Sequence, residues 1–311
     1  MPIRKLGRWL TNRAADVLMP RILLRIEEAS PWKKNVFFPS PDALGYGSDY
    51  PFMASSACVA SDFFHSDFAR ICQIIGETPH FHRKQWEFVF IFHHAERLGL
   101  MGPGRRGLVF GVGREPLPAA FASLGCDIVA TDAPAELASK SGWDRSGQFA
   151  PGLSVLPQGR LDREAFEARV TWRPCDMNAI DPELTDFDFC WSSCALEHLG
   201  SLDAGLEFIV NSVEKTLKVG GVALHTTELN LSSNWETIEQ GDTVFYRRRD
   251  LEAVIARLRE RGHEADELVV GRNAFVMNNF TDTPPFTAGH LLLHHQGFTV
   301  TSVGLVVRRG R

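Results

Sequence analysis

The stretch from Arg106 to Asp132 constrains the fold of this 311-residue chain more than any other part of its sequence. Leu108 to Phe110 is a short apolar run, which predicts a buried strand. Gly111-Val112-Gly113 follows, and a turn without side chains at two positions lets a ligand approach the backbone. A predicted helix over 116–124 leads to a second apolar run, which ends in Asp132. This βαβ pattern is typical of nucleotide sites, where an acid at the end of the second strand holds ribose hydroxyls; an ordinary strand–turn–helix without a ligand is the alternative.

Two residues after the turn change the expected ligand. A dinucleotide fingerprint has a third glycine at Pro116, where the helix meets a pyrophosphate. Glu115 also places a negative charge at the helix N-terminus, where the pyrophosphate would lie. This acid favours a ligand that has no phosphate, or a cationic one. S-adenosylmethionine (SAM) meets both conditions, because it keeps the adenosine, lacks phosphate and carries a sulfonium.

The rest of the chain alternates predicted strands and helices, which favours a mostly parallel sheet covered by helices. The predicted strands cover 170–175, 187–193, 222–226, 268–270 and 298–307, and the predicted helices 79–100, 203–217 and 249–261. The aromatic face of the helix over 79–100 is expected in the core or in a lid, and its basic residues on a solvated face or, alternatively, against a cofactor carboxylate or the substrate. Residues 139–159 are long for a connection between strands, so they predict a flap near the site or a surface loop.

The order of these motifs resembles that of the class I SAM-dependent methyltransferases over residues 100–311. The motifs are Gly111-Val112-Gly113-x-x-Pro116, Asp132, Asp176, the Phe187-Asp188 strand with Leu196-Glu197-His198, and Leu217-Lys218-Val219-Gly220-Gly221. The resemblance implies an α/β fold: a doubly wound, seven-stranded, mostly parallel sheet with an antiparallel last strand and helices on both faces. It also implies methyl transfer by in-line displacement from the sulfonium. Residues 1–100 would be a helical or irregular extension, acting as a lid or partner contact, and 101–311 the SAM-binding domain.

The resemblance further implies a SAM site at the ends of the first four strands. Its expected residues are Gly111, Val112, Gly113, Glu115, Pro116, Asp132, Ala133, Asp176, Met177 and Ser193. Asp176 would accept from the adenine amino group, or else cap the next turn, and Met177 would pack on the ring. The sequence departs from the family at Val109, where an acid is common, and at Glu115, where a glycine is common. We therefore expect Glu115 to hold the methionine ammonium group in place of the missing acid.

The catalytic candidates follow the fourth and fifth predicted strands. Methyl transfer depends on alignment and on exclusion of water, but a hydroxyl acceptor also benefits from a base with a pKa near 7, which favours histidine. Glu197 and His198 follow the fourth strand, and His225 and Glu228 lie at or beyond the end of the fifth, where we expect them to face the same crevice. Alternatively, Glu197-His198 organises the cofactor side of the site or caps a helix.

The net charge and the number of cysteines limit the kinds of partner and the compartment that we expect for this protein. A net charge of −5 and a pI near 6.1 give no general basic surface for nucleic acid, so we expect a small-molecule or carbohydrate acceptor. Residues 1–34 have a basic amphipathic pattern that suits a peripheral membrane contact, a partner contact or a helix on the same domain. Six cysteines without a CxxC pair favour free thiols in a reducing, cytoplasmic compartment. Two other functions fit the sequence, that of a nicotinamide-dependent oxidoreductase and that of a non-catalytic SAM-binding scaffold. The sequence predicts no oligomeric state.

Overall fold

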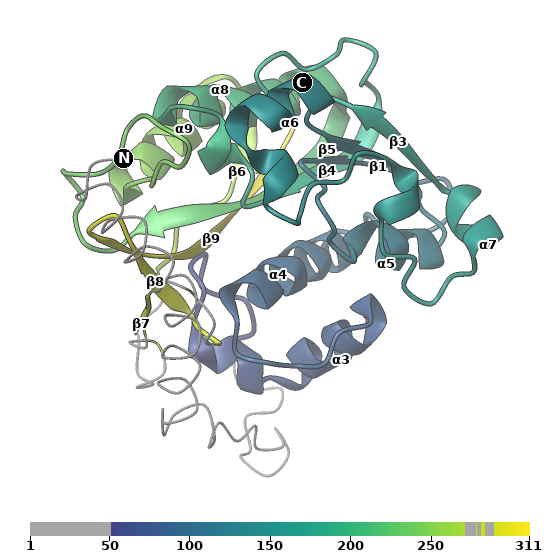
Figure 1. The fold of residues 1–311 in the computed structure, drawn as a ribbon, viewed down its shortest axis with the longest axis horizontal. Helices are drawn as coiled ribbons and strands as arrows, with labels where there is room; N and C mark the ends of the chain where they lie inside the picture. The colour runs from purple at the N-terminus through teal and green to yellow at the C-terminus, as the bar shows by residue number, and fades with distance from the viewer. Residues whose placement is uncertain (1–50, 271–277, 279–280, 284–288) are drawn as a thin grey trace, which may run out of the picture.

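The computed structural model describes residues 51–270, 278, 281–283 and 289–311, so the predicted amphipathic helix over 1–34 lies outside the described residues (Figure 1). The described strands form one nine-stranded sheet in the order β3-β2-β1-β4-β5-β9-β8-β7, with β6 paired to β9. They are β1 (Arg106–Phe110), β2 (Asp127–Asp132), β3 (Val170–Pro174), β4 (Phe187–Ser193), β5 (Leu217–Asn230), β6 (Glu264–Ala265), β7 (Thr281–Asp282), β8 (Leu292–His295) and β9 (Phe298–Arg308). Seven of these strands have four residues or more, and β6 and β7 have two each.

The directions of the strands confirm the predicted doubly wound fold. Strands β1 to β5 run parallel to one another, and β9 pairs antiparallel with β5, with Thr226 opposite Gly304. The carboxyl ends of five parallel strands therefore meet at one edge of the sheet. The strand predicted over 268–270 is wrong. The Val269 carbonyl accepts from the Ser56 amide at 2.6 Å instead of from a strand, and the chain pairs with β9 earlier, through β6.

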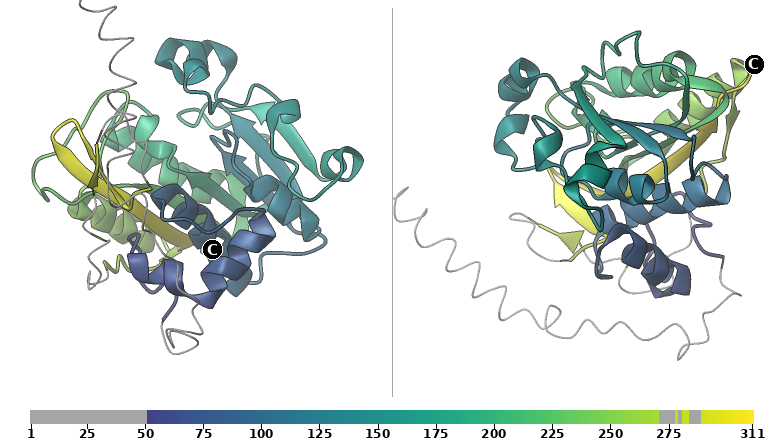
Figure 2. Two further views of the ribbon diagram at one scale, coloured as in Figure 1. Left: turned by 60° about the horizontal axis from the view of Figure 1, so that its bottom comes forward. Right: turned by 90° about the vertical axis from the view of Figure 1, so that its right-hand side faces the viewer.

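Helices cover both faces of the sheet, so the molecule has three layers (Figure 1). Alternate residues of each strand point to opposite layers, as the period of a strand requires. The helices are α3 (Ser66–Ile75), α4 (Arg83–Arg97), α5 (Leu117–Ser123), α6 (Ala135–Ser141), α7 (Arg163–Glu167), α8 (Leu202–Asn211) and α9 (Arg248–Glu260). Val109 and Trp191 pack towards α3, α4 and α5, whereas Leu108 and Cys190 pack towards α8 and α9. In the right-hand view of Figure 2 the blue helices α3 and α4 and the green helices α8 and α9 lie on opposite sides of the sheet.

Helix α4 packs in the core against one face of the sheet, and its first turn lies at the carboxyl edge of the sheet. It begins after His82, whose Nδ1 accepts from the Lys84 amide at 3.1 Å. Trp86 and Phe90 are buried against the sheet, and the helix lies so close to β9 that a Cβ on Gly304 would lie 2.2 Å from the Phe90 ring. Within the part of the chain that the structure describes, no helix is both long enough and apolar enough to cross a membrane.

Candidate functional site

The glycine turn after β1 lies against the segment that follows β4. Gly111 and Gly113 have φ values of +61° and +51°, a conformation that favours residues without a Cβ. A Cβ on Gly111 would lie 2.8 Å from the Cβ of Ala195 and 3.6 Å from the sulfur of Met177. The Val112 amide donates to the Thr131 carbonyl at 2.8 Å, which ties the turn to β2. The ends of β1, β2, β3 and β4 are thus brought together.

Asp132 ends β2 at the same edge, and its carboxylate is buried. Oδ1 accepts from the Ala133 amide at 2.8 Å and from the Trp143 indole N–H at 2.9 Å. Oδ2 accepts from the Ala150 amide at 3.0 Å and from the Gly113 amide at 3.1 Å. Burial raises the pKa of Asp132, although these four hydrogen bonds oppose the shift. The acid predicted to hold a ribose therefore lies at the glycine turn.

The end of β3 supplies the two predicted adenine contacts. Asp176 Oδ1 accepts from the Asn178 amide at 2.8 Å, the turn-capping arrangement that was the alternative for this residue. Met177 is largely buried beside Gly111. Their contact with an adenine stays a prediction.

Glu115 is buried beneath the glycine turn, on the α4 side of the sheet. Its Oε1 accepts from the Trp191 indole N–H at 2.6 Å. Burial raises the pKa of Glu115 to about 7, against the hydrogen bond from Trp191 that lowers it. Pro116 is the N-cap of α5, where a missing amide hydrogen costs little. The role of Glu115 as the partner of an ammonium group stays a prediction.

A buried charge cluster fills the carboxyl ends of β4 and β5, and Glu87 of α4 lies at its centre. Glu87 is fully buried, and its carboxylate lies 3.3 Å from the Arg83 guanidinium and 3.0 Å from the Lys84 ammonium. It also accepts from the Ser302 hydroxyl at 2.5 Å and from the Cys194 thiol at 3.1 Å. Burial alone would favour the neutral acid, but Lys84 and Arg83 hold the pKa of Glu87 below its ordinary value.

The same cluster reaches β5 through Glu228. Its Oε1 lies 2.5 Å from Arg83 Nη2, so this predicted catalytic residue is bound in an ion pair. Arg83 Nε is buried without a hydrogen-bond partner among the described residues. Cys194 has a φ of +46°, which is strained for a residue with a Cβ, and burial raises the pKa of its thiol well above the ordinary value. An unpaired donor and a strained residue are typical of ligand sites.

Glu197 and His198 lie in a 3-10 turn after β4. Glu197 is fully buried, with Oε2 accepting from the Thr227 hydroxyl at 3.0 Å and Oε1 without a hydrogen-bond partner among the described residues. Burial raises the pKa of Glu197. His198 is exposed, and its Nδ1 lies 2.9 Å from the Asp242 carbonyl, with its ring stacked on Trp143 at 6.5 Å between centroids. The Thr243 hydroxyl, which can donate or accept, lies 3.2 Å from the same nitrogen. Because a carbonyl only accepts, the Asp242 contact favours the neutral tautomer of His198 with its proton on Nδ1 and its lone pair on Nε2.

The structure does not bring His225 to this site. Residues three apart on a strand point to opposite faces, so Glu228 points towards α4 and His225 points towards α8. The two ring nitrogens of His225 each lie 2.9 Å from a serine hydroxyl, of Ser192 and of Ser212. Burial lowers the pKa of His225 to about 3. The expectation that His225 shares a crevice with Glu228 is therefore wrong.

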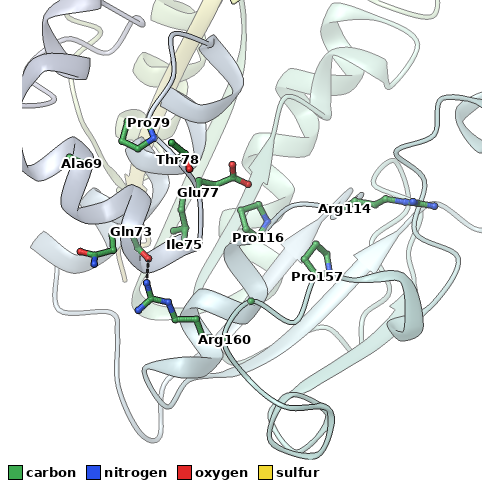
Figure 3. Close-up of a pocket in the computed structure, with 12 residues that line it drawn as sticks. Ala69, Gln73, Ile75, Glu77, Thr78, Pro79, Arg114, Pro116, Pro157 and Arg160 are labelled. Atoms are coloured by element: carbon green, nitrogen blue, oxygen red, sulfur yellow. Dashed lines mark hydrogen bonds between the residues drawn. The ribbon is translucent and has the colours of Figure 1, made fainter. Parts of the chain in front are cut away.

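A cavity of about 600 Å³ borders the glycine turn on the side of α3 (Figure 3). Its lining residues are Ala69, Gln73, Ile75, Gly76, Glu77, Thr78, Pro79, Arg114, Pro116, Pro157, Gly159 and Arg160. The carboxylate of Glu77 points towards Pro116, and Arg160 donates to the Gln73 carbonyl at 3.0 Å. The segment before β1 therefore forms a wall of this cavity.

Sequence reasoning missed the contribution of α4 to the site. The sequence predicts the basic residues of this helix on a solvated face or, alternatively, against a cofactor carboxylate or the substrate. In the structure Arg83 is mostly buried and Lys84 donates to the Ser193 carbonyl at 2.8 Å. One signal was present. Glu87 is an acid inside the otherwise apolar run 86–92, and a buried acid needs cations close by.

No protein-family model and no curated protein matches the sequence. Solved structures do resemble the fold. Phosphoethanolamine N-methyltransferase 2 of Haemonchus contortus, in complex with SAM, is 15% identical over 81% of this chain and 57% of that chain, with a TM-score of 0.43. A TehB-like SAM-dependent methyltransferase of Corynebacterium glutamicum is 13% identical over 77% and 93%, with a TM-score of 0.39.

The [4+2]-cyclase SpnF is 16% identical over 57% of this chain and 58% of that chain, with a TM-score of 0.39. The chain thus spans just over half the length of SpnF and of the Haemonchus enzyme, and almost the whole of the Corynebacterium one. At these identities and TM-scores the similarity concerns the fold, and the activity must be argued from the site.

Proposed function

We propose that this protein transfers the methyl group of SAM to a hydroxyl group of a small molecule or a carbohydrate. The observation that carries the proposal is the hydrogen bond from the Gly113 amide to Asp132, 3.1 Å long. It places the acid at the end of β2 directly on the glycine turn, where a nucleoside ribose would find both. Ala133, which follows β2, also donates to Asp132, and Met177, which follows β3, lies beside Gly111.

Charge favours SAM over a phosphate-bearing cofactor. The site contains the acids Glu87, Glu115, Glu197 and Glu228 against the cations Arg83 and Lys84. Glu87 and Glu228 are paired with these cations, whereas burial raises the pKa of Glu115 and of Glu197. A sulfonium or ammonium group would lower both raised pKa values, and a phosphate would raise them further.

His198 is the proposed general base. Its Nδ1 is directed to the Asp242 carbonyl, which leaves the lone pair on Nε2 free to take the proton of an acceptor hydroxyl. Glu197, its neighbour in the chain, would stabilise the imidazolium that forms. SAM supplies the methyl group, while this chain aligns the acceptor and excludes water.

Calorimetry with S-adenosylhomocysteine (SAH) tests the cofactor assignment. Asp132→Asn should weaken binding about tenfold or more, since a hydrogen bond to a charged group contributes about 1.5–3 kcal/mol. Asp127→Asn is the matched control, because Asp127 begins the same strand at the opposite edge of the sheet. Binding of NAD in place of SAH would contradict the proposal and favour an oxidoreductase. Binding of SAM without methylation of any hydroxylated acceptor in a radiolabel screen would favour a scaffold.

A further inference from the structure

The carboxylate of Asp132 has no acceptor position left for a ribose. A carboxylate offers about four lone-pair positions. All four are taken by N–H groups of the protein, two on each oxygen, at distances of 2.8 to 3.1 Å. A ribose hydroxyl can therefore donate to Asp132 only if one of these groups leaves.

The four donors divide into two kinds. The Gly113 amide belongs to the glycine turn, and the Ala133 amide directly follows β2. Both are fixed by the pairing of β1 with β2 in the sheet. The indole of Trp143 and the amide of Ala150 belong to one segment, 143–150, that crosses from the end of β2 over the turn. The carbonyl of Gln148 lies over Gly113, 3.2 Å from where a Cβ would stand.

The segment is held to the site by few contacts. Residues 144–148 are exposed, and the hydrogen bonds of Ser146 are made within the segment, to Trp143 and Gln148. Trp143 is the exception, since its ring also lies over the ring of His198, with 27° between the planes. One side chain therefore contacts both the predicted ribose acid and the proposed base.

We propose that Trp143 and Ala150 are exchange partners of the ribose: its two hydroxyls replace the indole N–H and the Ala150 amide on Asp132. Trp143 is then a positioning residue, because its indole N–H competes with a ribose hydroxyl for Asp132 and so lowers the affinity for the cofactor. Its release also removes the ring that stacks on His198. This inference rests on the proposed function, because it requires an adenosine cofactor on Asp132.

Trp143→Phe tests the exchange, because it keeps an aromatic ring on His198 and removes the competing N–H. We expect it to bind SAH more tightly in calorimetry, by about tenfold or more, which corresponds to one hydrogen bond to a charged group. Trp235→Phe makes the same chemical change at a ring that is 75% exposed, outside the proposed site, and should leave the affinity unchanged. Equal or weaker binding by Trp143→Phe overturns the exchange, since Trp143 would then be a plain cofactor contact.

Hydrogen exchange gives a second measurement on the unmodified protein. The Ala150 amide is protected by Asp132, so saturation with SAH should speed its exchange, whereas a segment that only closes over the cofactor would show slower exchange. Slower exchange at Ala150 overturns the proposal. If neither the natural protein nor Trp143→Phe binds SAH, the proposed function itself fails, an outcome distinct from binding with unchanged affinity.

Discussion

The guanidinium of Arg83 lies 2.5 Å from the carboxylate of Glu228 and joins the first turn of α4 to the end of β5. On its other side Arg83 meets Glu87, which also holds Lys84. A helix from before the first strand thus completes the edge of the sheet where the proposed chemistry takes place. The pairs are buried, so their partners depend on one another for charge compensation.

Glu87→Gln should therefore destabilise the fold strongly. It leaves the buried Arg83 without one of its two carboxylates and Lys84 without its ion pair, and removal of one partner of a buried pair costs about 3–5 kcal/mol. Glu96→Gln is the matched control on the same helix, because its ion pair with Arg70 is exposed and should contribute at most about 1 kcal/mol. Urea unfolding of both variants checks the difference. Similar losses in the two would mean that the cluster contributes no more than a surface pair.

Close packing of α4 on β9 predicts a second effect on stability. Gly304→Ala places a methyl group 2.2 Å from the Phe90 ring, so the helix must shift, at a cost of about 1–3 kcal/mol. Gly152→Ala is the control, since its backbone is extended and nothing lies within 4 Å of its Cβ position. Thermal unfolding of both variants would show the difference. Unchanged thermal stability in Gly304→Ala would indicate that α4 does not pack closely on β9.

The pKa of Glu115 predicts a pH dependence of stability. Burial raises this pKa from 4.5 to about 7, so the folded state holds the proton over a range in which the unfolded chain has lost it. The stability that neutral Glu115 contributes below pH 4.5 is therefore lost as the pH rises through about 7, by up to about 3 kcal/mol. Glu115→Gln carries no ionisable proton and should lack this loss. Urea unfolding at pH values below 4.5 and above 7 compares the two proteins, and parallel pH curves would contradict the burial of Glu115.

The same carboxylate gives cofactor binding the opposite trend. A cationic ligand prefers ionised Glu115, so the affinity for SAM should rise as the pH increases through about 7. In Glu115→Gln the affinity should be several-fold weaker at the upper end of this range and should depend less on pH. Calorimetry on both sides of pH 7 measures it. Unchanged affinity in the variant would rule out Glu115 as the ammonium partner.

The fold could be predicted from the sequence because the strands are short apolar runs between glycines and polar strand ends. Arg106–Asp132 is the best case, since the turn, α5 and β2 all lie within a few residues of their expected places. The positions of the side chains inside the site are harder to predict from the sequence. The sequence predicts His225 and Glu228 at or beyond the end of the fifth strand, facing one crevice. In the structure β5 is regular as far as Asn230, so its alternation puts the two side chains on opposite faces of the sheet. Pairing across more than a hundred residues, as between Arg83 and Glu228, follows from tertiary packing and leaves no local pattern.

The placement of the two histidines predicts different effects on catalysis. His198→Gln should lower kcat about a hundredfold or more on an acceptor found by the screen, because it removes the lone pair on Nε2, while SAH affinity stays unchanged. His225→Asn should keep kcat and instead lower the free energy of unfolding by about 1–3 kcal/mol, because Ser192 and Ser212 each lose a buried partner. Steady-state kinetics and urea unfolding on both variants separate the roles. Loss of kcat in His225→Asn with full activity in His198→Gln would reverse the assignment, and full activity in both would exclude a histidine base.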